Sequence, residues 1–156
     1  MRGPERITAM LDKLLREELT AVNQYMVHAE MCDNWGYGKL HRDIQKTAID
    51  EMKHAEKLIG RILFLEGLPT VTNLDAITIG KDVKGILEID LSAESAAVPS
   101  YNAAILHALE LRDGGTRELL EDILKDEERH LDWLESQRDQ VAQMGIQNYL
   151  AQQCGE

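Results

Sequence analysis

The sequence has few of the residues that interrupt helices or that build thiolate sites. Its 156 residues include three prolines, one phenylalanine and two cysteines, Cys32 and Cys154. The two cysteines form no CxxC pair, which argues against a structural zinc or iron–sulfur site, and we expect both to be reduced thiols. Leu, Ala, Glu, Lys and Ile dominate instead, a composition typical of long helices. We therefore expect an all-α fold.

The sequence also lacks long apolar runs and clusters of basic residues. No segment approaches the length of a membrane span, and the N-terminus has no apolar signal-peptide core. The net charge is −11, so a phosphate-binding face is hard to build. We expect a soluble, cytoplasmic protein with neither nucleic acid nor membrane as a partner, folded as one domain over residues 1–156.

Helical periodicity divides the chain into four long segments and one short one. Apolar spacing predicts helices over residues 7–32, 40–65, 83–112 and 116–144, and a short helix over 146–153. The first and third connections are short, whereas residues 69–82 have no sustained period and form a long one. This order predicts a ferritin-like four-helix bundle with a long crossover and a short fifth, C-terminal helix. Pro99 predicts a kink or local irregularity in the third helix.

The two halves of the sequence repeat at a constant offset. Three pairs of residues are separated by 76 positions: Glu18 and Glu94, Glu51 and Glu127, and His54 and His130. The same offset aligns Tyr25 with Tyr101 and Asp50 with Asp126. One Glu-x-x-His motif on a helix is most simply an exposed ion pair or a capping histidine. Two copies, each preceded by a glutamate at the same distance, fit the di-iron template of ferritin-like bundles.

The spacing of these residues directs them into the bundle, where they predict a metal site. Residues three apart on a helix share a face, so Glu51 and His54 project together, on the same face as Ile44 and Leu58. Four ionised carboxylates in a low-dielectric interior would repel one another unless two divalent cations neutralised them. Mixed carboxylate and imidazole ligands suit Fe(II), Mn(II) or Zn(II) better than Mg(II) or Ca(II). Oxidation of Fe(II) is the chemistry that such a site favours.

Over essentially its whole length the sequence resembles the bacterioferritins, as the motifs DEMKHAEKL, DEERHLDWLE, RILFLEGLP and MGIQNYL show. The resemblance implies bridging carboxylates from Glu51 and Glu127, terminal carboxylates from Glu18 and Glu94, and terminal imidazoles from His54 and His130. It further implies a ferroxidase that oxidises Fe(II) with oxygen or peroxide at two irons per subunit and stores ferric mineral inside a 24-subunit shell. A bacterioferritin-associated ferredoxin would release the iron. Whether the shell also contains a second type of ferritin subunit is left open.

Met52 points to the opposite side of its helix. It follows Glu51 directly and so lies about 100° away from it on the helical wheel, together with the apolar Ile59 and Leu63. Such a second apolar stripe predicts contact with another subunit, and Met52 on its own would suit an ordinary interface. Bacterioferritins bind haem at a two-fold subunit interface through one methionine from each subunit. Met52 stands at that position, which implies a haem b shared between two subunits, whereas Glu128 takes its place in the second half.

The sequence departs from some bacterioferritins at two positions near the predicted centre. Some members carry a histidine where this chain has Lys46, and with a residue equivalent to Asp50 it forms an inner-surface iron site. A protonated lysine cannot bind iron, so the sequence argues against that auxiliary site. Tyr25 and Trp133 match aromatic residues that could deliver electrons, but Leu58 replaces a third aromatic residue that some members have.

Two other functions could use the same ligands. A rubrerythrin-like peroxidase would need the same two irons, but no CxxC rubredoxin module accompanies the bundle. A haem electron-transfer or structural assembly would leave the six ligands without a role. An iron-storing ferroxidase is therefore the leading hypothesis.

Overall fold

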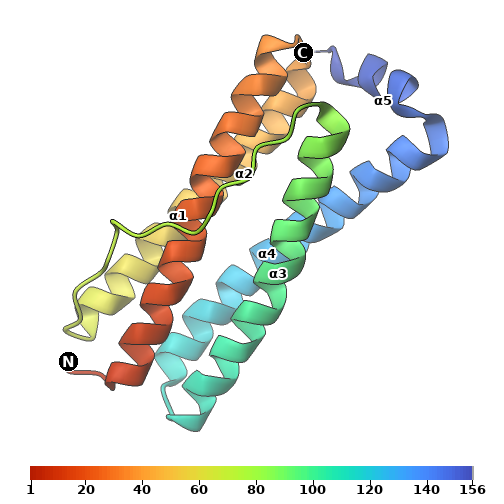
Figure 1. Cartoon of the computed structure of the whole chain (residues 1–156). Helices are drawn as coiled ribbons and strands as arrows, with labels where there is room; N and C mark the ends of the chain where they lie inside the picture. Colours follow the sequence, from red (N-terminus) through yellow and green to blue (C-terminus); the bar gives the residue numbers. More distant parts are fainter. Residues whose placement is uncertain (156) are drawn as a thin grey trace.

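The bundle consists of two antiparallel helix pairs joined by a long crossover (Figure 1). The computed structural model describes residues 1–155, within which it has no β-strand. Its helices are α1 (Glu5–Asn34), α2 (Gly38–Phe64), α3 (Val83–Glu110), α4 (Gly114–Met144) and α5 (Ile146–Gln153). α1 packs along α2 and α3 along α4, and the crossover passes outside α1 to reach the start of α3 (Figure 1). The predicted all-α bundle of four long helices, with a long crossover and a short fifth helix, is confirmed.

Each helix end lies within two residues of its predicted position, and the start of α4 shows what sets such an end. α4 begins at Gly114, two residues before the predicted start, because the Asp113 side chain caps it by accepting hydrogen bonds from the Thr116 N–H at 3.0 Å and from the Thr116 hydroxyl at 2.6 Å. Arg61 of α2 donates a further hydrogen bond to Asp113 at 2.9 Å. α3 continues through Pro99 as one helix, so the loss of one main-chain donor does not end it, and the kink at Pro99 stays a prediction.

A buried polar cluster fixes one end of the crossover to the bundle. The Gly80 N–H donates to Nε2 of His28 at 3.0 Å, which leaves the proton on Nδ1 to donate to Asp90 at 2.8 Å. Gln24 donates to the same Asp90 oxygen at 3.1 Å. A Cβ on Gly80 would lie 2.6 Å from the Ile86 nitrogen, so only glycine permits this close approach. The crossover is thereby held against α1 and α3.

A band of polar side chains divides the core into two apolar clusters. The first cluster joins the start of α1 to the end of α2, the end of α3 and the start of α4, and it includes Leu11, Leu58 and Tyr101. The second joins the opposite ends of those helices with α5, and it includes Tyr25 and Leu134. The polar band between the two clusters contains all six of the predicted metal ligands.

The outer side of α2 carries exposed apolar residues. Ile49, Met52 and Leu63 lie on one face of the helix, and Met52 is 44% exposed. Met52 therefore points away from the polar band, as its position after Glu51 predicts. Among residues 1–155, no helix has both the length and the apolar character that a membrane span requires.

Candidate metal centre

The bundle brings the six predicted ligands together at its midpoint. All six are buried, with at most 5% of any of them exposed. Their ligand atoms form two groups, each within 4.8 Å: Glu18, Glu51, His54 and Glu127 in one, and Glu51, Glu94, Glu127 and His130 in the other. Glu51 and Glu127 belong to both groups. Each could therefore bridge two metal ions, with one histidine and one further glutamate completing each position.

One polar atom on each of the six residues is buried without a hydrogen-bond partner. Among the described residues, ten buried side-chain atoms have no such partner, and six of them belong to the six predicted ligands, one atom on each. An unpaired buried polar atom costs roughly 1–3 kcal/mol. Contacts of 3.0 Å between His54 Nδ1 and Glu127 Oε1, and between His130 Nδ1 and Glu51 Oε1, offset part of this cost only while the histidines are protonated. Two divalent cations would satisfy all six atoms at once, and carboxylate and imidazole donors suit iron. The residues present therefore fit a pair of metal ions.

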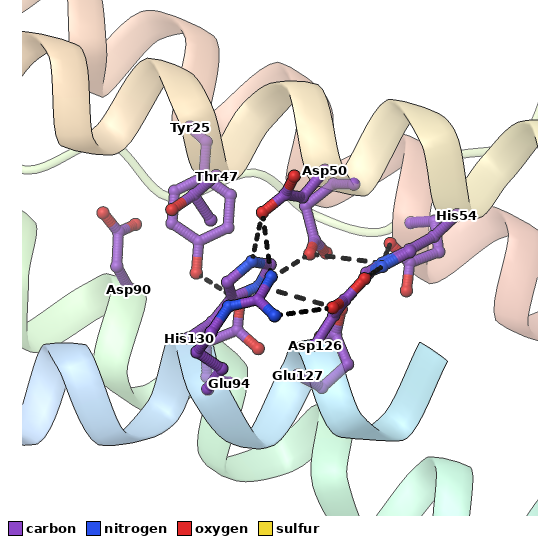
Figure 2. A network of polar contacts seen from close by, with 12 residues as sticks. Tyr25, Thr47, Asp50, His54, Asp90, Glu94, Asp126, Glu127 and His130 are labelled. Atoms are coloured by element: carbon purple, nitrogen blue, oxygen red, sulfur yellow. Dashed lines mark hydrogen bonds and ion pairs between the residues drawn. The ribbon is translucent and has the colours of Figure 1, made fainter. Parts of the chain in front are cut away.

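Outer aspartates orient the two histidines. His54 donates from Nε2 to Asp126 at 2.7 Å, and His130 donates from Nε2 to Asp50 at 2.9 Å. These hydrogen bonds engage Nε2 of each histidine and turn Nδ1 towards the glutamates, the orientation that a metal-binding histidine requires (Figure 2). Nδ1 of His54 lies 3.0 Å from Glu127 Oε1 without the alignment of a hydrogen bond. The two imidazole rings are 6.2 Å apart.

Two buried tyrosines hold the outer carboxylates. Tyr25 donates its hydroxyl to Glu94 at 2.6 Å, and Tyr101 donates to Glu18 at 2.5 Å. Burial, followed by the nearby glutamates, raises the pKa of both phenols well above its usual value, so both remain donors. The sequence predicted no role at this centre for Tyr101 or Asp126, although the offset of 76 residues that pairs them with Tyr25 and Asp50 is a signal for both.

In the absence of metal, the surroundings of Glu51, Glu127 and His54 raise their pKa values and so favour the protonated forms. Burial, and then the charge of Glu18, raises the pKa of Glu51 and Glu127 well above its usual value. Burial alone would lower the pKa of His54, but contact with Glu127 and Glu18 raises it strongly. Metal ions would displace these protons and neutralise the same carboxylates.

A cavity of about 340 Å³ leads to the centre between α1, α3 and the crossover. Its lining includes Glu18, Glu94 and both tyrosines, together with small side chains such as Ala21 and Ala97. The carboxylates Glu17 and Asp75 also line it. A small cation and a small oxidant therefore have room next to the predicted ligands.

A second cavity, of about 170 Å³, touches His130 and contains two basic residues. Lys46, Asp50, Arg129 and Trp133 contribute to its lining. Asp50 already accepts hydrogen bonds from His130 at 2.9 Å and from Arg129 at 3.5 Å. Two cationic side chains, and a carboxylate that already accepts two hydrogen bonds, make this cavity a poor site for an iron ion.

Comparison with known proteins identifies the family. A family model described as a ferritin-like domain matches residues 8–144. The chain is 38% identical to a bacterioferritin from Mycolicibacterium paratuberculosis over 152 residues, covering 97% of this chain and 96% of the relative. It is 39% identical to a bacterioferritin from Brucella melitensis and 38% identical to one from Rhodobacter capsulatus, each over 149 residues that cover 96% of this chain and 92% of the relative. The chain belongs to the bacterioferritin family.

Proposed function

We propose that this protein stores iron and oxidises Fe(II) at a di-iron centre within each subunit. The observation that carries the proposal is the set of six buried, unpaired ligand atoms, one on each predicted residue. Glu51 and Glu127 would bridge the two ions. Glu18 and His54 would complete one position, and Glu94 and His130 would complete the other. Membership of the bacterioferritin family supports iron as the metal.

The residues would assist the oxidation by binding and positioning. Two Fe(II) ions, as substrate, would give up one electron each, and the electron pair would reduce oxygen to peroxide or peroxide to water. Carboxylates hold the more highly charged Fe(III) more strongly than Fe(II), which favours electron loss. Asp126 and Asp50 would keep the imidazole lone pairs directed at the iron, and the cavity beside Glu18 and Glu94 would admit the oxidant.

Family membership supports further proposals about the assembly. We expect a shell of twenty-four subunits that encloses the ferric mineral, with a bacterioferritin-associated ferredoxin as the reductant for its release. The exposed apolar face of α2 would be covered at a two-fold interface with another subunit. There Met52 would supply a thioether ligand to a shared haem b, whose iron can accept and donate single electrons.

Iron loading in air separates storage from the alternatives. Assembled, metal-free protein given successive additions of Fe(II) should keep far more than two irons per subunit in solution as ferric mineral. A parallel titration of buffer alone would show how much iron precipitates without protein. Saturation at two irons per subunit would contradict storage and favour a rubrerythrin-like peroxidase. Uptake can be counted by eluting the shell from a size-exclusion column and assaying its iron.

Replacing Met52 with Leu should remove the axial haem ligand with little change in volume. We expect haem content to fall, or the low-spin absorption spectrum of bis-methionine ligation to disappear, because leucine has no donor atom. Met144→Leu is the matched control, since Met144 is also exposed but lies at the end of α4. An unchanged haem spectrum in the Met52→Leu variant would rule out Met52 as the ligand.

A further inference from the structure

Tyr25 and Tyr101 are equivalent residues of the internal repeat. They are 76 positions apart, the same offset that relates the two sets of ligands. Each is 1% exposed, and each lies at the inner border of a different apolar cluster, Tyr101 in the first and Tyr25 in the second. Their hydroxyl groups therefore enter the polar band from opposite ends of the bundle.

The two hydroxyl groups make reciprocal contacts across the repeat. Tyr101 of the second half donates to Oε1 of Glu18 in the first half, at 2.5 Å. Tyr25 of the first half donates to Oε1 of Glu94 in the second half, at 2.6 Å. The other oxygen of each carboxylate, Oε2, is buried and has no hydrogen-bond partner. Each phenol thus occupies one oxygen of a glutamate and leaves the other free.

We infer that Tyr101 is a positioning residue for the metal centre, which fixes Glu18 so that Oε2 faces the ion bound with Glu51, His54 and Glu127. Tyr25 acts in the same way on Glu94 for the other ion. The inference rests on the proposed di-iron function. It adds two tyrosine–glutamate hydrogen bonds outside the ligands, which repeat with the same two-fold arrangement as the ligands themselves. Neither tyrosine needs to contact a metal ion for this role.

Packing alone does not account for the Tyr101 hydroxyl. A phenylalanine would fill the same apolar surroundings without bringing a polar group into the interior, where an unpaired hydroxyl is costly. A tyrosine is favoured only if its hydroxyl has a partner, and here that partner is a predicted ligand. Outer contacts of this kind typically change metal affinity by about 10- to 100-fold when they are removed.

Co(II) binding to the assembled, metal-free protein tests the inference without any turnover. Visible absorption and calorimetry should show two Co(II) per subunit in the wild type. In the Tyr101→Phe variant, one of the two sites should weaken by about tenfold or more, and its absorption spectrum should change, because Glu18 is no longer held in place. Tyr25→Phe should weaken one site to a similar extent, and the double variant should weaken both.

Tyr149→Phe is the matched control for the loss of a buried phenol. Tyr149 is fully buried and donates its hydroxyl to Gln137 at 2.7 Å, within the second apolar cluster near α5. The variant should bind two Co(II) as the wild type does, even if its melting temperature falls. A purely structural role for Tyr101 would make the Tyr101→Phe variant behave like this control.

A double-mutant cycle identifies the partner of Tyr101. Adding Tyr101→Phe to a Glu18→Gln protein should cause no further loss of Co(II) affinity, whereas adding it to a Glu94→Gln protein should cause the full loss. If the wild type binds two Co(II) and the Tyr101→Phe variant binds them with the same affinities, the positioning role of Tyr101 is overturned, but the di-iron proposal is not. A wild type without two Co(II) sites would overturn the di-iron proposal on which that role rests.

Discussion

Replacing Glu127 with Gln should lower the initial rate of Fe(II) oxidation by about 100-fold or more. The ligand atoms of Glu127, like those of Glu51, belong to both groups of the centre, so its loss affects both metal positions. Removing an outer contact already costs about 10- to 100-fold, and a shared ligand should cost at least as much. Stopped-flow absorbance, after the addition of two Fe(II) per subunit to the metal-free shell, measures the rate.

The same variant should not destabilise the metal-free protein. Burial, and then the charges of Glu18 and Glu51, raises the pKa of Glu127 well above its usual value. The ionised carboxylate therefore destabilises the metal-free protein. A neutral Gln relieves this repulsion, and we expect the melting temperature to be unchanged or higher. Glu128→Gln, at the adjacent exposed position, should retain the wild-type rate. A fast Glu127→Gln enzyme would contradict the proposed bridging role.

Replacing Asp90 with Ala should cause the largest loss of stability outside the metal centre. Asp90 is fully buried and accepts hydrogen bonds from His28 and Gln24, so its removal leaves two buried donors unpaired. Each buried donor left unpaired costs about 1–3 kcal/mol, and the two together should lower the melting temperature by roughly 10 °C for a chain of this size. Hydrogen exchange should also accelerate at the Gly80 amide, because His28 no longer has the partner that fixes its ring.

Asp90→Asn separates the hydrogen bonds from the charge. Burial raises the pKa of the Asp90 carboxyl, although His28 and Gln24 oppose the effect, so the negative charge itself is not favoured at this position. An asparagine oxygen can accept the same two hydrogen bonds, and we expect most of the stability to remain. We attribute the stability to the side-chain oxygen of residue 90, which accepts both hydrogen bonds. Equal losses of melting temperature in the Asp90→Ala and Asp90→Asn variants would contradict this explanation.

The architecture and the six ligands could be predicted because both depend on local periodicity and on a repeat. Apolar spacing predicts each helix to within about two residues at most ends, and the constant offset of 76 residues pairs the ligands from the sequence alone. The largest differences are two residues, as at the start of α4, where a pair of glycines normally indicates a break in a helix. The Asp113 side chain instead stabilises α4 from its first turn.

The outer contacts could not be predicted because they cross from one half of the repeat to the other. Alignment pairs Tyr25 with Tyr101, but it does not reveal that each tyrosine contacts the other half's glutamate, which depends on how the two hairpins pack. The cluster of His28 and Asp90 gave no signal of any kind. At the offset of 76 residues their counterparts are Ala104 and Leu14, so nothing in the repeat indicates a polar contact.

Anomalous diffraction at the iron absorption edge tests the di-iron centre most directly. Crystals of the protein soaked anaerobically in Fe(II) should show two peaks within every subunit, both in contact with Glu51 and Glu127. One peak should also contact Glu18 and His54, and the other Glu94 and His130. Peaks elsewhere, or a single peak without these ligands, would contradict the central claim.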